Sequence, residues 1–337
     1  MTITGNHQQK PLVVLIGPTA VGKSRIAIPL AQALKTEILT ADSRQVYRGM
    51  DIGMDKPRLD ERGGILHRLI DLVEPDQPFN VGEFRRLALN EIARLHQNGR
   101  VPLMVGGTGL YVRAIVRGLW EGPPADWDYR HRLAAVAERD GTEPLYRELA
   151  QIDPELAARL HPRDVIKIIR GLETYHVTGH RLSELHREHG FAEHPFSSLL
   201  IGLTRDRQAL YRRVEARVDA QLAAGLVEET RRLLAQGYGR HLGSMKGLGY
   251  RQMSGYLAGE YSYEEAVRLL KRDTRHFAKR QYTWFRKEPG IVWVEMEEDE
   301  SVDSTVSKLV GMVQGFLSQG IDRDGSQVQS AILMAGS

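Results

Sequence analysis

The chain has 337 residues, of which 42% are hydrophobic and 26% charged, so it has the composition of a soluble globular protein and room for two structural units. Its 46 lysines and arginines nearly balance 43 aspartates and glutamates, so a nucleic-acid partner must be argued from local basic clusters. Cysteine is absent, which excludes disulfides, thiolate metal sites and cysteine nucleophiles. With neither a signal peptide nor an apolar run of about 18 residues, we expect a cytoplasmic protein with no membrane partner.

A phosphate-binding motif lies near the start of the chain. An apolar run at 12–16 leads into GPTAVGKS, which fits G-x-x-x-x-G-K-[ST], and a helix-like segment follows at 25–34. In this motif glycines turn backbone N–H groups toward an anion, the lysine reaches phosphate oxygens, and the next hydroxyl can ligate Mg²⁺. The alternative is an ordinary glycine turn between core elements. We predict a phosphate-chain site, with Mg²⁺ as cofactor and Ser24 as its ligand, formed by Gly17, Pro18, Thr19, Ala20, Val21, Gly22, Lys23 and Ser24.

Strands and helices alternate after this motif. We expect strands at 37–41, 68–72 and 101–105, and a helix at 82–98 that ends at Asn98-Gly99. The strand at 101–105 is apolar throughout, as a buried parallel strand should be, and a second glycine turn, GGTGLY, follows it. This order predicts an α/β fold with a P-loop-type parallel sheet core.

The alternation stops at 118–127, a segment rich in glycine and proline. Residues 128–194 have helical patterns, clearest at 163–178, before the sheet pattern returns with a strand at 198–204. Further helices are expected at 207–224, 226–236, 262–286 and 302–317, with a strand at 291–295. We therefore predict a P-loop α/β catalytic core from 10–118 plus 198–317, a helical insertion domain at 119–197, and a disordered tail at 318–337.

The acidic residue expected of a kinase or NTPase is missing from its usual place. Such enzymes hold Mg²⁺ with an acid at the end of a core strand, but the strand at 101–105 ends in Gly106-Gly107-Thr108. An aspartate, Asp42, instead follows the second strand, at the sheet edge where ligands bind. Its carboxylate has three possible roles, which are to ligate Mg²⁺, to take a proton from a nucleophile, or to cap a turn.

The helix at 207–224 is rich in arginine. Arg213 and Arg217 are four residues apart on one face, where two guanidinium groups can clamp a pyrophosphate. The alternative is a solvated face whose arginines pair with Asp206, Glu215 and Asp219 of the same helix.

Two segments have the composition of an RNA-binding surface. The first, 271–287, interleaves lysines and arginines with four aromatic residues that either stack on bases or pack in the core, and core packing is favoured in an amphipathic helix. The second, 245–251, has two glycines that would keep the backbone accessible beside Lys246, Tyr250 and Arg251. No groove-reading motif is present, which favours single-stranded or loop RNA over duplex DNA.

Long motifs over most of the chain resemble those of the bacterial tRNA dimethylallyltransferases, also called tRNA isopentenylpyrophosphate transferases. The matching segments are GPTAVGKS (17–24), DSRQVYRGMDIGMDKP (42–57), HRLIDLVEP (67–75), VGGTGLY (105–111), HPRDVIKIIRGLE (161–173), LYRRVEARVD (210–219), GLGYRQM (247–253) and AKRQYTWFR (278–286). The resemblance implies transfer of the dimethylallyl group of dimethylallyl pyrophosphate to N6 of the adenosine 3′-adjacent to the anticodon in tRNA. The products would be N6-isopentenyladenosine and pyrophosphate.

The resemblance also implies roles for individual residues. Asp42 matches the general base, Thr108 matches a catalytic position beside the reacting adenine, and Arg217 joins the phosphate loop in holding pyrophosphate. The implied tRNA contacts are Asp42, Ser43, Arg44, Gln45, Thr108, Arg130, Ile166, Lys167, Ile168, Ile169, Arg170, Lys246, Gly247, Leu248, Gly249, Tyr250 and Arg251. The helical insertion resembles a domain that grips the anticodon stem-loop. Since no heptad pattern demands a partner helix, we expect a monomer.

Two other functions stay open. A P-loop small-molecule kinase would act on ATP and ignore RNA, and the missing acid after residue 105 argues against it. An RNA-binding protein with a vestigial phosphate loop would leave Lys23, Ser24 and Asp42 without a role.

Overall fold

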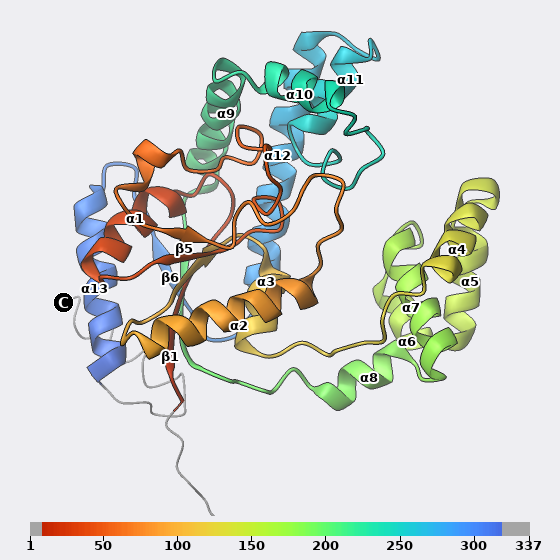
Figure 1. Ribbon diagram of the computed structural model, residues 1–337, viewed down its shortest axis with the longest axis horizontal. Helices are drawn as coiled ribbons and strands as arrows, with labels where there is room; N and C mark the ends of the chain where they lie inside the picture. The colour runs from red at the N-terminus through yellow and green to blue at the C-terminus, as the bar shows by residue number, and fades with distance from the viewer. Residues whose placement is uncertain (1–8, 319–337) are drawn as a thin grey trace, which may run out of the picture. The chain divides into compact units, whose positions relative to one another are not determined.

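The computed structural model describes residues 9–318. The chain forms two compact units (Figure 1). One unit combines the chain up to Val116 with the chain from Pro195 onward, and the other is Arg117–His194. Ser318, expected at the start of the tail, is instead the last residue of a helix, and 319–337 lie outside the described residues.

The larger unit is built on a six-stranded parallel sheet, which confirms the predicted α/β class. The strands are β1 (Pro11–Ile16), β2 (Ile38–Ala41), β3 (His67–Arg68), β4 (Leu103–Gly106), β5 (Ser197–Thr204) and β6 (Ile291–Glu295). Their order in the sheet is β3-β2-β4-β1-β5-β6. Because β1 lies between β4 and β5, the loop after β1 opens where the strand order reverses, which is where ligands bind in such sheets.

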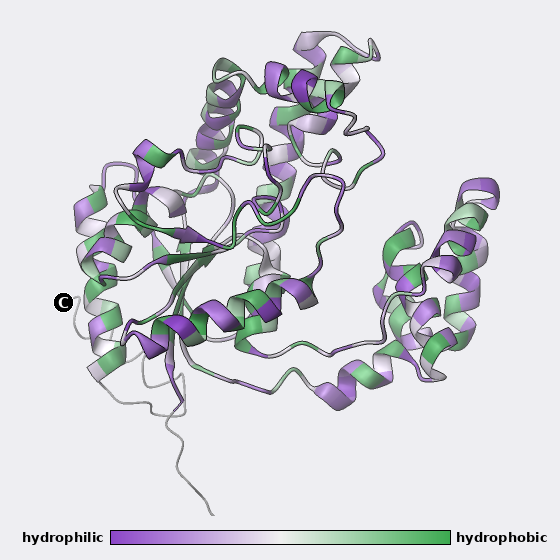
Figure 2. Ribbon diagram, viewed as in Figure 1, coloured by the Kyte–Doolittle hydropathy of each residue, from purple (hydrophilic) through white to green (hydrophobic). Residues whose placement is uncertain are grey.

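Helices cover both faces of the sheet. Val13 and Leu15 of β1 pack against α1 (Lys23–Ala33) and α13 (Val302–Ser318), while Leu12, Val14 and Ile16 pack against α2 (Val81–Gln97) and α3 (Gly109–Val116). Side chains alternate across a strand, so a strand covered on both faces must be apolar at every position. Hydrophobic and hydrophilic residues alternate along α2 and α13 in Figure 2, as expected for helices with one face on the sheet.

A third group of helices lies at the carboxyl ends of the strands (Figure 1). These helices are α9 (Arg207–Ala223), α10 (Leu226–Ala235), α11 (Tyr250–Leu257) and α12 (Tyr263–Phe285). They share an apolar cluster with the segment after β2, in which Met50, Leu226 and Tyr250 are fully buried. The long helix α12 also reaches the sheet, where its Phe285 is buried.

The smaller unit contains only helices among its described elements: α4 (Trp127–Asp140), α5 (Glu143–Ile152), α6 (Pro154–Arg159), α7 (Val165–Thr178) and α8 (Leu182–His189). Leu149, Ile168 and Leu172 form the centre of its apolar core. The buried carboxylate of Asp153 accepts hydrogen bonds from the backbone of Leu156 and from the backbone and hydroxyl of Ser183, which fixes α6 and α8 together.

Three local predictions differ from the structure. The strand expected at 68–72 ends at Arg68, because Leu69 and Asp71 have left-handed φ angles of 65° and 53° that leave the extended conformation. The helix α11 is not among the helices expected from the sequence, and it begins directly after Gly249. The helical structure expected up to residue 194 ends at His189. A short 3₁₀ helix, which was not predicted, lies at Leu59–Arg62.

None of the helices described in residues 9–318 is both long enough and apolar enough to cross a membrane.

Candidate active site at the phosphate loop

The phosphate loop has the backbone conformation that its glycines allow. Gly17 (φ 154°) follows β1, and a Cβ atom there would lie 2.8 Å from the carbonyl oxygen of Leu203. Gly22 has φ 118°, and α1 begins at the next residue. The Lys23 ammonium donates hydrogen bonds of 2.8 Å to the carbonyls of Gly17 and Pro18, so the lysine closes the loop from inside.

A glutamine that sequence reasoning missed links this loop to the second glycine turn. Gln281 of α12 accepts the Thr19 N–H at 2.8 Å and donates to the Gly107 carbonyl at 2.9 Å. The contact joins residues far apart in the sequence, and nothing in a helical pattern distinguishes this buried polar position from an exposed one. Gln281 therefore holds the two glycine loops at a fixed separation.

Two arginines hold backbone carbonyls of the phosphate loop. Arg205 donates to the Val21 carbonyl at 2.9 Å, and Arg213 donates through Nε to the Ala20 carbonyl at 3.0 Å. Burial lowers the pKa of both guanidinium groups from the ordinary value. Arg213 was expected to clamp the anion; its Nε group supports the loop, and its side chain also lines the cavity beside that loop.

The cavity beside the phosphate loop measures ≈ 620 Å³, which lies within the range of roughly 300–1,000 Å³ that is typical of small-ligand sites. Its wall includes Lys23 and Ser24 of the loop, Asp42 after β2, and Arg217 of α9. The cavity thus brings together the predicted anion-binding residues and the predicted base.

Asp42 and Thr108 are neighbours because their strands pair. Ala41 of β2 lies opposite Gly106 of β4, and a Cβ atom at Gly106 would lie 2.0 Å from the Ala41 carbonyl oxygen. The Thr108 N–H donates to that carbonyl at 3.2 Å, and the Thr108 hydroxyl accepts the Ser43 N–H at 2.9 Å. One oxygen of Asp42 accepts the Arg44 N–H at 2.8 Å, so Asp42 also stabilises a turn while it lines the cavity.

The charges in the cavity act on one another. Burial and the neighbouring Arg217 lower the pKa of Lys23 to about 8, while Asp42 and Asp55 partly oppose this change. Arg217 pairs with Asp55, at 3.0 Å from Nη1 to Oδ2. The alternative pairing within α9 is not present, because Glu215 pairs with Arg275 and Asp219 pairs with Lys271.

The cavity contains some, but not all, of the ligands that a metal ion needs. The Ser24 hydroxyl and the Asp42 carboxylate both line the cavity, and oxygen ligands of this kind suit Mg²⁺. Within residues 9–318, however, no three histidine, cysteine or acidic side chains gather closely enough to hold a metal by themselves. A metal there would need ligand atoms from the substrate, such as pyrophosphate oxygens.

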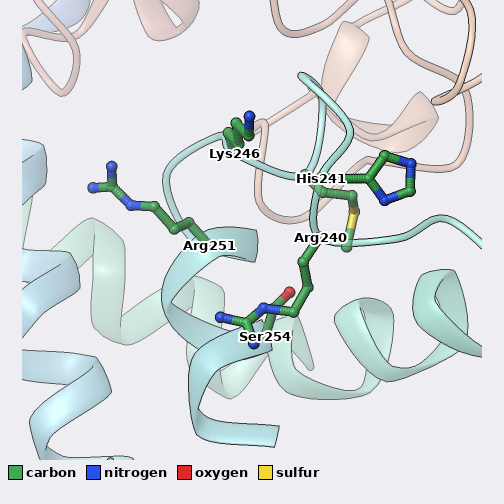
Figure 3. Close-up of a pocket in the computed structure, with 6 residues that line it drawn as sticks. Arg240, His241, Lys246, Arg251 and Ser254 are labelled. Atoms are coloured by element: carbon green, nitrogen blue, oxygen red, sulfur yellow. The ribbon is translucent and has the colours of Figure 1, made fainter. Parts of the chain in front are cut away.

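A second cavity, of ≈ 470 Å³, lies around the predicted RNA-binding segment 245–251 and is lined by Arg240, His241, Met245, Lys246, Arg251 and Ser254. Figure 3 shows these side chains on the loop before α11 and on α11 itself. Arg251 pairs with Asp273 at 2.6 Å. The buried Ser254 hydroxyl has no hydrogen-bond partner among the described residues.

The expectation of an accessible backbone in this segment is wrong at three residues. Gly247, Gly249 and Tyr250 are buried, and Tyr250 donates its hydroxyl to Glu229 at 2.5 Å. The start of α11 packs these residues into the apolar cluster, which leaves Lys246 and Arg251 exposed.

The smaller unit also separates the predicted RNA contacts into exposed and buried residues. Ile166 is 80% exposed and Lys167 is exposed, but Ile168 and Ile169 lie in the helical core and cannot reach a ligand. This follows from the helical period of α7, which turns these two side chains inward.

Arg130 and Arg170 share one buried carboxylate. Arg130 donates two hydrogen bonds to Glu173, at 2.7 and 2.8 Å, and Arg170 donates one at 2.5 Å. Burial alone would raise the pKa of Glu173, but these hydrogen bonds lower it below the ordinary value. The two predicted RNA-binding arginines are thus held in place by one anion and keep a surplus of positive charge.

The outward face of α12 forms a basic groove of ≈ 430 Å³ lined by His276, Lys279, Arg280, Thr283, Trp284 and Lys287. Phe285 is fully buried, as the helical pattern favoured, whereas Trp284 is partly exposed beneath the Arg113 guanidinium. Segment 271–287 therefore combines a core aromatic residue with a cationic surface.

Comparisons with known proteins identify the family of the chain. Residues 45–288 match the family model described as IPP transferase. The chain is 49% identical over 287 residues, covering 85% of this chain and 93% of the relative, to a protein named tRNA dimethylallyltransferase 2 from Geotalea uraniireducens. It is 47% identical over 305 residues, covering 90% and 98%, to a tRNA dimethylallyltransferase from Geobacter metallireducens.

Solved structures give the same result. A full-length tRNA isopentenylpyrophosphate transferase from Bacillus halodurans aligns with a TM-score of 0.70 and 38% identity, over 96% of this chain and 99% of that one. A eukaryotic dimethylallyltransferase acting on tRNA aligns with a TM-score of 0.79 and 26% identity, over 94% of this chain and 81% of that one.

Proposed function

The chain belongs to the IPP transferase family, and from that premise we propose that it transfers the dimethylallyl group of dimethylallyl pyrophosphate to tRNA. The acceptor would be N6 of the adenosine 3′-adjacent to the anticodon, and pyrophosphate would leave. The observation that carries this proposal is the single cavity lined by Lys23, Ser24, Asp42 and Arg217. It combines a holder for an anionic leaving group with a carboxylate that can accept a proton.

The reaction forms a bond between N6 and the first carbon of the dimethylallyl group and breaks the bond from that carbon to pyrophosphate. An exocyclic amine is a weak nucleophile because its lone pair is delocalised into the ring, so its proton should leave as the new bond forms. Two observations support this role for Asp42: the Arg44 N–H holds one of its oxygens, and its side chain lines the cavity. Thr108, hydrogen-bonded to Ser43, would position the adenine edge.

Negative charge accumulates on the departing pyrophosphate. Lys23, Arg217 and the N–H groups at the start of α1 would stabilise it, which lowers the barrier to bond breaking. Mg²⁺, held by Ser24 and the pyrophosphate oxygens, would add further charge neutralisation when bound. This use of a phosphate loop needs no nucleoside triphosphate.

The tRNA would bind through exposed cations on both units. We propose contacts at the half-buried Arg44 and Gln45, at the exposed Lys246 and Arg251, and at the exposed Lys167 and its apolar neighbour Ile166 in the helical unit, whose role would be to grip the anticodon stem-loop. Arg130, Arg170, Ser43 and Leu248 remain proposed contacts of the same surfaces. The target adenosine must leave its stack to reach a cavity, as base-modifying enzymes require. A tRNA substrate supports a cytoplasmic location, and we expect a monomer, which light scattering would test.

A P-loop small-molecule kinase is not favoured. The strand β4 ends in Gly106 and continues into Gly107 and Thr108, without the acid that phosphoryl transfer requires. The family match gives no support to a kinase.

The direct test is to incubate the protein with Mg²⁺, radiolabelled dimethylallyl pyrophosphate and undermodified tRNA, and then to analyse the nucleosides. Label in N6-isopentenyladenosine is the expected result. No label, together with ATP turnover on a panel of metabolites, would overturn the proposal in favour of a kinase.

A further inference from the structure

The wall of the cavity beside the phosphate loop includes a loop at 51–55 with the sequence DIGMD. Asp51, Ile52, Met54 and Asp55 of this loop all line the cavity. The loop is neither helix nor strand, so its backbone groups must find hydrogen-bond partners outside regular secondary structure.

Glu229 of α10 supplies one buried carboxylate to three consecutive N–H groups of this loop. Its two oxygens accept from Asp51 at 3.1 Å, from Ile52 at 3.0 and 3.1 Å, and from Gly53 at 3.1 Å. Only 3% of Glu229 is exposed. A buried carboxylate is tolerated only when several hydrogen-bond donors satisfy it. The same hydrogen bonds hold the loop in one conformation.

Two further side chains fix the same loop. The Gln221 amide of α9 donates to the carbonyls of Ile52 and Gly53, at 2.9 and 3.3 Å. The Tyr250 hydroxyl donates to Glu229 at 2.5 Å, and its ring lies so close to Gly53 that a Cβ atom there would be 2.5 Å away. Helices α9 and α10 therefore satisfy the donors and acceptors of the loop, and Tyr250 of α11 packs its ring against it.

The far end of the loop meets the groups proposed to bind the substrates. Asp55 pairs with Arg217 at 3.0 Å, and Gln45, two residues beyond Ser43, donates to the Met54 carbonyl at 3.1 Å. A displacement of the loop would therefore move the Arg217 guanidinium within the cavity.

We propose that Glu229 is a positioning residue for pyrophosphate binding, acting through the loop at 51–55 on Arg217, with the Tyr250 hydroxyl holding the Glu229 carboxylate in place. The proposal rests on the function proposed above for the same cavity. Glu229 itself does not line that cavity, so its effect must pass through the loop.

Replacing Glu229 by glutamine tests this mechanism with little change in volume. An amide has one acceptor oxygen and turns an NH₂ group toward N–H donors, so at least one loop N–H loses its partner. A hydrogen bond to a charged group contributes roughly 10–100-fold to affinity. Because Glu229→Gln would displace the Arg217 guanidinium from the anion, we expect it to weaken binding of inorganic pyrophosphate by about tenfold.

The experiment compares Glu229→Gln and Tyr250→Phe with the matched control Glu228→Gln, whose side chain is 69% exposed on the same helix. Calorimetry with inorganic pyrophosphate, steady-state kinetics, tRNA binding and thermal unfolding are measured for each. Glu229→Gln should raise KM for dimethylallyl pyrophosphate more than it lowers kcat and leave tRNA affinity within about twofold. Tyr250→Phe should act in the same direction but less strongly, and Glu228→Gln should behave as wild type.

Unchanged pyrophosphate affinity in a folded Glu229→Gln protein would refute the proposal. Equal losses of pyrophosphate and tRNA affinity with a lower Tm would show a merely structural role and refute it also. If Glu229→Gln does not fold, Tyr250→Phe decides the matter, because it removes one hydrogen bond and keeps the ring. Pyrophosphate binding needs no transfer to tRNA, so failure of the proposed function would appear separately, as a wild-type protein that binds pyrophosphate but labels no tRNA.

Discussion

Raising the pH from 7 to 9 should weaken the binding of dimethylallyl pyrophosphate. The reason is Lys23, whose pKa of about 8 lies well below the ordinary 10.5 because of burial and the neighbouring Arg217. Only the ammonium form attracts an anion, so binding needs the protonated lysine. Because Lys23 loses its proton as the pH rises through 8, the affinity for dimethylallyl pyrophosphate should fall, and most of the fall should occur between pH 7 and 9.

The magnitude follows from the titration curve. A group with this pKa is charged in roughly nine-tenths of molecules at pH 7 and in roughly one-tenth at pH 9. The Kd should therefore rise about tenfold over this range. An ordinary lysine would stay charged and give a nearly constant Kd. Asp55 opposes the lowering, so Asp55→Asn should lower the pKa of Lys23 further and shift the loss of affinity to lower pH.

Calorimetric titration at half-unit pH steps, at constant ionic strength and Mg²⁺, would measure this dependence. The control is Lys23→Met, which should bind weakly and with a Kd that does not change between pH 7 and 9. A constant Kd in the wild-type protein would refute the reasoning. The same slope in Lys23→Met would also refute it, because another group would then be titrating.

Three further predictions concern the base, the glycine turn and the helical unit. Asp42→Asn should lower the transfer rate by about 10²–10⁴-fold, with tRNA affinity within about twofold in filter binding; near-normal turnover would exclude Asp42 as the base. Gly106→Ala should lower the Tm or prevent folding, because the new Cβ would lie 2.0 Å from the Ala41 carbonyl oxygen; an unchanged Tm would contradict the close approach of β2 and β4. Ile168→Ala should cost about 2–5 kcal/mol in the free energy of unfolding, whereas the exposed Lys167→Ala should cost little and instead weaken tRNA binding, as denaturant titration and binding assays would show.

The parts of the site that follow local rules could be predicted from the sequence. The phosphate loop is a contiguous motif whose glycines dictate its conformation, so Gly17 to Ser24 could be located directly. Asp42 could be placed on the same edge because the carboxyl ends of parallel strands meet there. Arg217 followed from helical spacing and from the resemblance to a known family.

The supporting contacts could not be predicted, because they join residues distant in the sequence. Gln281 and Glu229 are polar residues on amphipathic helices, and a helical pattern gives such residues an outward position. In the fold both are buried, where loop backbone groups satisfy them. Tyr250 was misplaced for the same reason: two glycines suggested an open segment, but tertiary packing turned it into the start of a buried helix.

The position of β1 in the sheet has a consequence for synthesis of the chain. Its two neighbours are β4 and β5, and Pro11 pairs with Ser197, so one edge of β1 lacks its partner until the helical unit has been translated. The core of that unit contains only residues of Arg117–His194, so it can form on the ribosome before β1 pairs with β5. We expect the helical unit to resist protease first in arrested nascent chains, and the phosphate loop to become ordered only after β5 emerges.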